Sequence, residues 1–91
     1  MSTSYRIAET EAYQKKITRS EYRKYYQRVL DRLYPQLRKN PFSGPNIKRL
    51  KGDMSSIYRY RIGDYRLFYT IDSEKRIVYL LDMDNRKEAY R

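Results

Sequence analysis

The sequence predicts a single α+β domain in which helices pack on one face of a small twisted sheet. Three observations support this prediction. The chain has 91 residues, which is enough for one modest core. Its first half carries apolar residues at the three- and four-residue spacing of a helix. The part that follows Gly52 contains three segments rich in Tyr, Ile, Val, Leu and Phe, which are typical of strands.

The N-terminal segment predicts a short strand and then a short helix. Residues 4–9 alternate, with Tyr5 and Ile7 on one side and Arg6 on the other, as in a strand. We expect a helix over 10–16, because Thr10 is a suitable N-cap and the next apolar residues lie four positions apart.

A long helix is predicted over about 19–38. Thr18 and Glu21 have the spacing of a capping box, in which each side chain binds an unpaired backbone N–H group at the start of a helix. Pro35 falls inside the pattern, so the helix either kinks there or ends and restarts with Pro35 in a first turn. The apolar stripe of this helix consists of Tyr22, Tyr25, Tyr26, Val29, Leu30, Leu33, Tyr34 and Leu37.

The second half predicts an antiparallel meander of three strands over 57–62, 65–71 and 76–83. The Pro and Gly residues between positions 40 and 45 indicate a loop before it. Gly63 and Asp64 form a two-residue hairpin connection with Gly first, which is typical of a type II′ turn.

The hairpin turn fixes a register that gathers three arginines on one open face. A two-residue connection pairs Arg61 with Arg66 and Arg59 with Phe68, and strand alternation then places these four on the same side. The opposite side, which can receive the apolar stripe of the long helix, carries Tyr58, Tyr60, Ile62, Tyr65, Leu67 and Tyr69.

The pairing of Arg61 with Arg66 is unfavourable by a few tenths to about 1 kcal/mol, because like charges lie directly across a strand pair. A bound anion would relieve this repulsion. Phosphate accepts the forked donors of Arg, and the ring of Phe68 offers a surface on which a base can stack. The alternative is a solvated outer face whose arginines lie apart along their long stems. Further cations come from the segment 47–52, expected to be a loop at the edge of the sheet, and from the C-terminal tail.

Composition excludes several kinds of chemistry. The chain has no Cys, which excludes disulfides, zinc sites on thiolates, iron–sulfur clusters and thiol nucleophiles. It has no His, which removes the commonest general base and metal ligand and excludes serine–histidine hydrolases and HNH-type nucleases. We therefore expect neither a metal nor another cofactor.

The net charge of +10 indicates an anionic partner. Basic chains of this size bind nucleic acid, an anionic membrane or an acidic protein, although a basic surface can also serve solubility alone. No stretch approaches the ~18 consecutive apolar residues of a membrane span, and the N-terminus has no apolar signal segment. We expect a soluble, cytoplasmic protein.

Four segments, taken in order, resemble the RelE/ParE superfamily of bacterial toxins, particularly its RelE-type ribosome-dependent mRNA endonucleases. The resemblance covers essentially the whole chain and implies a single RelE-like toxin domain over 1–91, with helices on one face of a small sheet. The segments are Asn40-Pro41-Phe42, Ile47-Lys48-Arg49-Leu50-Lys51-Gly52, the Tyr- and Arg-rich hairpin over 58–69, and Asn85-Arg86-Lys87-Glu88-Ala89-Tyr90-Arg91.

The resemblance implies a set of catalytic residues. The family's basic residues on the first hairpin strand correspond to Arg59 and Arg61, and its strand arginine corresponds to Arg66. Its tail arginine and C-terminal tyrosine correspond to Arg86 and Tyr90. Arg59 and Arg61 stand where the best-known RelE members carry Lys. The residues that we expect to contact RNA or the ribosome are Lys48, Arg49, Lys51, Phe68 and Lys87.

The resemblance also implies cleavage of translated mRNA in the A site of the 30S ribosomal subunit. Attack of the RNA 2′-hydroxyl on the adjacent phosphate needs a base, stabilisation of the developing charge and an acid, and it needs no metal. We expect Arg61 and Arg66 to hold the scissile phosphate. Arg59 and Arg86 would contact neighbouring phosphates or donate a proton, and Tyr90 would act as the base or orient the hydroxyl.

Partners and competing functions follow from the same resemblance. A toxin of this kind is normally silenced by a small acidic antitoxin that covers its basic surface. One alternative is a ParE-like toxin that inhibits DNA gyrase and does not cut RNA. A second alternative is a non-catalytic RNA-binding module that uses the arginines as a phosphate platform.

Overall fold

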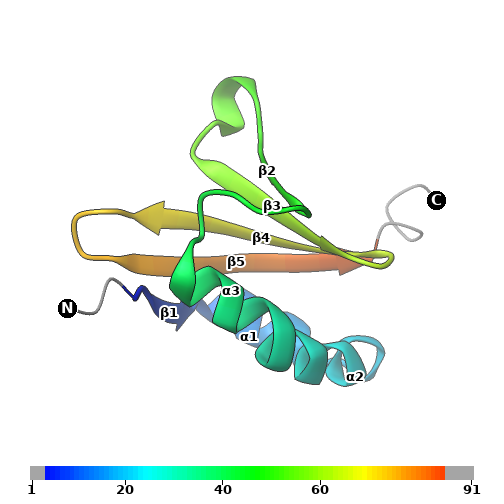
Figure 1. Ribbon diagram of the computed structural model, residues 1–91. Helices are drawn as coiled ribbons and strands as arrows, with labels where there is room; N and C mark the ends of the chain where they lie inside the picture. The colour runs from blue at the N-terminus through cyan, green and yellow to red at the C-terminus, as the bar shows by residue number, and fades with distance from the viewer. Residues whose placement is uncertain (1–3, 86–91) are drawn as a thin grey trace.

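The computed structural model describes residues 4–85 and contains a five-stranded sheet with helices on one of its faces (Figure 1). The strand order is β1-β5-β4-β3-β2. β1 runs parallel to β5, and the other neighbours are antiparallel. The α+β class and the single covered face are confirmed. The strands are β1 (Arg6–Glu9), β2 (Ile47–Arg49), β3 (Ile57–Ile62), β4 (Tyr65–Asp72) and β5 (Ile77–Asn85).

The sheet has one strand more than the sequence predicted. The segment 47–52 was expected to be a loop, but Ile47–Arg49 forms the edge strand β2 against β3. Backbone bonds from Arg61 N–H to the Asn46 carbonyl and from Leu50 N–H to the Ile57 carbonyl, 3.0 and 2.9 Å long, flank this pairing. Three residues are too few to show alternation, so this strand exists only through its partner.

The predicted hairpin register is confirmed at every position. Arg61 lies opposite Arg66, and Arg59 lies opposite Phe68. Gly63 has φ +57°, and Arg76 is the one residue other than Gly with a positive φ within residues 4–85. A positive φ at the first turn position alone is the type II′ pattern, as predicted.

The short helix is confirmed, but the capping box is wrong. In α1 (Glu11–Ile17) the N–H group of Tyr13 donates to Thr10 Oγ1, so Thr10 is the N-cap. Thr18 Oγ1 instead donates to the Lys15 carbonyl at 2.8 Å, and α2 (Ser20–Arg28) begins without a side-chain cap. The end of α1 lies so close to the start of α2 that Thr18 serves the first helix instead of the second.

The long helix accommodates its proline through one wide turn. It consists of α2, a π-helical turn η1 (Val29–Leu33) and α3 (Tyr34–Lys39). The N–H group of Tyr34 donates to the Val29 carbonyl, five residues back, and Pro35 lies in the first turn of α3. This is the restart alternative, since proline is tolerated in a first turn. None of the helices within residues 4–85 is long and apolar enough to cross a membrane.

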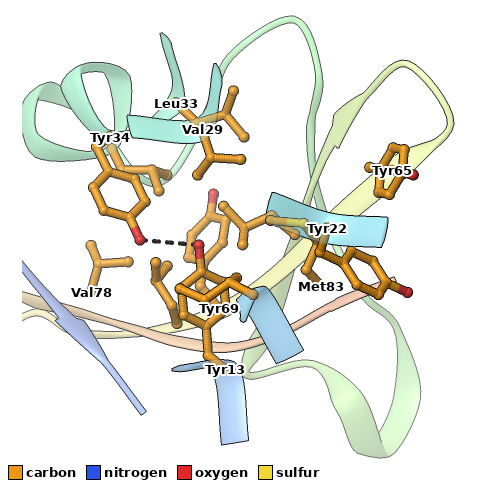
Figure 2. Close-up of a cluster of buried hydrophobic side chains, with 13 residues drawn as sticks. Tyr13, Tyr22, Val29, Leu33, Tyr34, Tyr65, Tyr69, Val78 and Met83 are labelled. Atoms are coloured by element: carbon orange, nitrogen blue, oxygen red, sulfur yellow. Dashed lines mark hydrogen bonds between the residues drawn. The ribbon is translucent and has the colours of Figure 1, made fainter. Parts of the chain in front are cut away.

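The core lies between the helices and the sheet and is rich in tyrosine (Figure 2). Tyr26 and Tyr34 each donate a hydrogen bond of 2.6 Å to Glu9 Oε2. The hydroxyls of Tyr13 and Tyr34 are bonded to each other at 3.0 Å (Figure 2). The buried apolar residues are Tyr13, Ile17, Tyr22, Val29, Leu33, Tyr34, Leu37, Tyr65, Leu67, Tyr69, Val78, Leu80 and Met83.

Candidate functional site

Strands β2 and β3 bring three cations together on the open face of the sheet. Lys48 lies directly across from Arg59, and Arg61 lies two residues further along the same side of β3. We call Lys48, Arg59 and Arg61 the open cation cluster. No carboxylate lies within 4.0 Å of any of them in the described part of the chain. A hollow of about 170 Å³ is lined by Pro45, Asn46, Ile47 and the three cations.

Arg59 carries the clearest sign of a missing partner. Its Nε atom is buried and has no hydrogen-bond acceptor, and no other buried side-chain nitrogen or oxygen within residues 4–85 shares this property. A buried donor that is left unpaired costs about 1–3 kcal/mol. An oxyanion in the adjoining hollow would supply an acceptor to this group and countercharge to the whole cluster.

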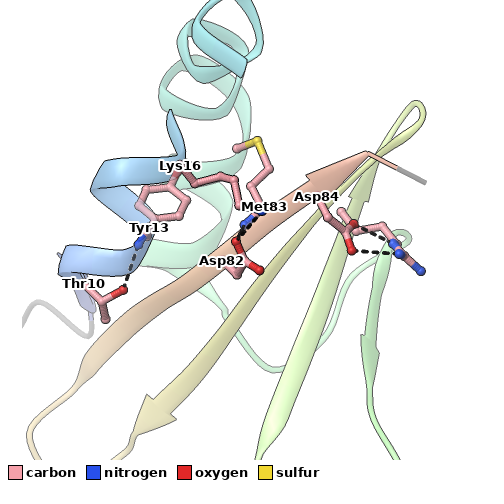
Figure 3. A network of polar contacts seen from close by, with 7 residues as sticks. Thr10, Tyr13, Lys16, Asp82, Met83 and Asp84 are labelled. Carbon is pink, nitrogen blue, oxygen red and sulfur yellow. Dashed lines mark hydrogen bonds and ion pairs between the residues drawn. The ribbon is translucent and has the colours of Figure 1, made fainter. Parts of the chain in front are cut away.

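Arg66 differs from the cluster because it has a counter-ion within the chain. Its Nε and Nη2 atoms donate to the two carboxylate oxygens of Asp84 on β5, each at 2.8 Å (Figure 3). Its guanidinium also lies 5.7 Å from the centre of the Phe68 ring. A bound anion is therefore not needed to relieve the repulsion between Arg61 and Arg66, contrary to the expectation from the sequence. Asp84 already supplies that charge, and the missed signal was the Asp-Met-Asp alternation at 82–84.

Two basic residues of the 47–52 segment do not join the cluster. Arg49 lies across from Tyr58, on the side of the sheet opposite to Lys48, and its Nε donates to the Ser55 carbonyl. Lys51 is exposed and precedes the 3₁₀ turn η2 (Gly52–Met54), away from the paired part of β2. Of the three predicted contacts from this segment, only Lys48 lies beside the arginines of β3.

The remaining predicted site residues belong to the C-terminal tail. Arg86, Lys87 and Tyr90 lie outside the described residues, so their assignments stay predictions. Asn85, which precedes them, pairs with Tyr65 at the start of β4.

Burial makes several of the described tyrosines poor bases near neutral pH. Burial raises the pKa of Tyr26 and of Tyr65 to about 12, and it also raises those of Tyr60 and Tyr69 above the ordinary value of 10.0. The pKa values of Tyr13 and Tyr34 are raised by the same cause. These hydroxyls therefore stay protonated and serve the core. Within residues 4–85 there is also no group of three or more carboxylates that could hold a metal ion.

Comparison with known proteins identifies the family of this chain. The family model described as "ParE toxin of type II toxin-antitoxin system, parDE" matches residues 6–90. No curated protein matches the sequence.

Solved structures of toxins share the fold. The toxin–antitoxin complex RelBE2 from Mycobacterium tuberculosis has a TM-score of 0.77 and 24% identity, with 92% of this chain and 100% of that chain covered. The archaeal RelE–RelB complex from Pyrococcus horikoshii has a TM-score of 0.67 and 21% identity over 92% and 97% of the two chains. A mutant of the E. coli toxin RelE in the free state has a TM-score of 0.68 and 22% identity over 97% and 90%. The chain therefore belongs to the RelE/ParE superfamily of toxins from type II toxin–antitoxin systems.

Proposed function

We propose that this toxin is an endoribonuclease that cleaves translated mRNA in the ribosomal A site. The observation that carries the proposal is the open cation cluster, whose three cations have no carboxylate within the described residues and whose Arg59 buries an unpaired donor. A surface that served only solubility would not need to bury such a donor. The groups that match it are the closely spaced oxyanions of a phosphodiester backbone.

The reaction needs no atom beyond those of RNA and protein side chains. The 2′-oxygen attacks the adjacent phosphorus, the bond to the 5′-oxygen breaks, and the products are a 2′,3′-cyclic phosphate and a free 5′-hydroxyl. Arg59 and Arg61 stabilise the charge that develops on the non-bridging oxygens. A proton moves from the 2′-hydroxyl to a base, and another proton moves from an acid to the leaving oxygen.

Before RNA binds, Arg66 is already paired with a carboxylate, that of Asp84. Its two bonds to Asp84 and its position over Phe68 fix the plane of the guanidinium. To contact phosphate, Arg66 must share its donors with Asp84 or leave it, whereas Arg59 and Arg61 have no carboxylate of residues 4–85 to give up. We therefore assign the first phosphate contact to Arg59 and Arg61, and we assign to Arg66 the orientation of the scissile group.

The tail residues complete the proposed site. The tyrosines whose pKa is raised by burial are not suited to accept a proton near neutral pH. On the family resemblance, we propose Tyr90 as the base or as the group that orients the 2′-hydroxyl. Arg86 would donate to the leaving group or to a neighbouring phosphate. Tyr and Arg are both poorly matched to neutral pH, so the ribosome must contribute by orienting the mRNA, an effect worth several kcal/mol.

An acidic antitoxin is the proposed protein partner. Two of the similar structures are complexes of a RelE-type toxin with RelB. A net charge of +10, and an open cation cluster that has no carboxylate nearby among residues 4–85, favour an acidic segment that neutralises them. The antitoxin would then compete with ribosome-bound mRNA for the same basic surface.

The proposal is tested by mapping mRNA 5′ ends after induction of the toxin. We expect cuts within A-site codons of translated messages, and we expect them to disappear when initiation is blocked. Arg61→Gln should reduce cleavage by about 10²-fold or more. Lys75→Gln is the matched control, because it removes one charge from the exposed β4–β5 turn and should leave cleavage unchanged. Cleavage that is equally strong in Arg61→Gln and in the wild type would overturn the assignment.

Tyr90→Phe and Arg66→Ala test the other proposed roles. Each should abolish translation-dependent cleavage without unfolding the domain. Arg66→Ala leaves Asp84 without its partner, so the double variant with Asp84→Asn separates the loss of a phosphate contact from the loss of the ion pair.

Inhibition of DNA gyrase is the second candidate, and the family model named for ParE favours it. A gyrase poison predicts a supercoiling defect in purified gyrase assays and no mRNA cuts. RNA retention without cuts and without a supercoiling defect would instead support the RNA-binding module.

A further inference from the structure

The open face of the sheet also contains an apolar groove beside the cations. Met54, Ile57, Phe68 and Leu81 line it together with Asp82, and its volume is about 270 Å³. Met54 is 50% exposed and is one of only two large apolar residues with this degree of exposure within residues 4–85. The other is Phe42, whose ring packs against those of Tyr5 and Tyr58.

An apolar groove at this position needs an explanation. The uncovered face of an antiparallel sheet is normally polar, since only the other face is packed. Here Ile57, Phe68 and Leu81, from three neighbouring strands, place apolar side chains on that face. The β4–β5 register shifts between Phe68 and Tyr69, and Leu81 is the unpaired residue of this bulge. Bulges re-aim side chains and are enriched beside functional sites.

Asp82 adds one polar group to the groove. Its Oδ1 atom accepts a 2.8 Å hydrogen bond from the Met83 N–H group and lies 3.4 Å from the Lys16 Nζ atom of α1 (Figure 3). No hydrogen bond to Oδ2 is found within the described range, and the side chain is 48% exposed. Asp82 is thus held through one oxygen while it lines the groove. A carboxylate oxygen can only accept, so it favours a ligand that presents a donor.

The surrounding charges favour RNA over an apolar peptide as the occupant. Arg59 of the open cation cluster lies across from Phe68, and Arg66 lies over the Phe68 ring. A phosphate bound by the cluster would therefore place its nucleoside next to this ring. The groove is smaller than the ~300–1,000 Å³ of pockets that hold drug-sized ligands, which suits one planar base.

We propose that this groove binds one base of the RNA and that Asp82 selects bases with an exocyclic amino group. The inference rests on the proposed function. Phe68, Ile57 and Leu81 contact the ring of the base, and Asp82 Oδ2 accepts from an amino group such as N4 of cytosine. Uracil presents O4 at the same position. Two acceptors would then face each other, so uracil is disfavoured.

The test uses the isolated toxin and two matched probes, a cytidine tetranucleotide and a uridine tetranucleotide. Methyl NMR signals of Met54, Ile57 and Leu81 report on the groove itself. We expect all three to shift on addition of the cytidine probe, and we expect that probe to bind about three- to tenfold more tightly than the uridine probe, which corresponds to one modest hydrogen bond.

Asp82→Asn should remove this preference without weakening overall binding, because an amide can both donate and accept. Glu74→Gln is the matched control. It also removes one negative charge, but from the exposed β4–β5 turn, so the preference should persist. In translation assays, Asp82→Asn should change which A-site codons are cut more than it changes the total amount of cleavage.

Three outcomes would overturn the inference. The groove methyls could stay unshifted while the probes bind elsewhere, Asp82→Asn could keep the preference, or the methyls could shift only with a bound antitoxin, which would make the groove a protein-docking site. The proposed function fails separately, because a toxin that binds cytidine in the groove but never cuts mRNA would contradict the nuclease and leave the base site intact.

Discussion

The two faces of the sheet differ in whether their polar groups have hydrogen-bond partners within the described residues. On the covered face, Tyr26 and Tyr34 donate to Glu9, and Tyr69 donates to the Pro41 carbonyl at 2.8 Å. On the open face, Arg59 buries a donor that has no acceptor within the described residues. These polar groups of the covered face are paired by the chain itself, whereas of the three arginines on the open face only Arg66 is paired in this way within residues 4–85, with Asp84, and the open cation cluster needs a bound anion.

This difference implies that the covered face contributes mainly to the stability of the fold and the open face mainly to binding. Burying apolar rings and pairing their hydroxyls favours folding, and clustering like charges opposes it. Substitutions on the covered face should therefore lower the free energy of unfolding, whereas substitutions in the open cation cluster should lower affinity for RNA and leave the fold intact.

Alkaline pH should have the largest effect on the covered face. Burial raises the pKa of Tyr26 and of Tyr65 to about 12 from the ordinary 10.0. The stability that comes from keeping these hydroxyls neutral is fully present below pH 10 and is lost as the pH rises through 12. Circular dichroism and tyrosinate absorbance should change together in that window. Full ionisation of the tyrosines in a folded protein would contradict this expectation.

Leu67→Ala should cause the next largest loss. Leu67 is fully buried on the covered face, so truncation removes apolar contacts and leaves a cavity. We expect the free energy of unfolding to fall by about 2–5 kcal/mol in urea denaturation. A loss below about 1 kcal/mol would mean that the covered face does not carry the stability.

Tyr34→Phe tests the hydrogen-bond network alone. It removes the hydroxyl that bonds both Glu9 and Tyr13, and we expect a loss of about 1–3 kcal/mol. Tyr79→Phe is the matched control, because no hydrogen bond to the Tyr79 hydroxyl is found in the described part of the chain. Equal effects of the two substitutions on the thermal midpoint would argue against a special role for the network.

Arg59→Gln should have the smallest effect on stability, within about 0.5 kcal/mol, because it removes a cation that repels Lys48 and a donor that has no acceptor among residues 4–85. Affinity for a short RNA should nevertheless fall, and its salt dependence should decrease by about one charge. A stabilised domain with unchanged RNA affinity would contradict the division between the two faces.

The sequence predicted the hairpin correctly because its information is local. A two-residue turn with Gly first allows one register, and that register placed Arg59, Arg61 and Arg66 on one face. The prediction missed β2 because its three residues form a strand only against β3, a contact from elsewhere in the chain. It failed at Thr18 for a local reason, because this side chain donates to the Lys15 carbonyl of the helix before it instead of capping the helix after it.

The sequence predicted which residues form the candidate site, but it did not predict which of them have a counter-ion. Arg59, Arg61 and Lys48 do lie together, as expected of a phosphate site. The pairing of Arg66 with Asp84 was missed, because it depends on the β4–β5 register across a bulge. The roles of Arg86, Lys87 and Tyr90 stay predictions.

The sequence by itself determined the α+β class, the hairpin register and the excess of positive charge, because each of these depends on residue spacing or on counting. Only the tertiary structure decided which cations have counter-ions. Strand order places Asp84 beside Arg66 and, within residues 4–85, leaves the open cation cluster without a carboxylate. A bulge adds Leu81 to the groove next to Phe68. The physical reason is that ion pairs and grooves form between segments distant in the chain, whose distances no local pattern encodes.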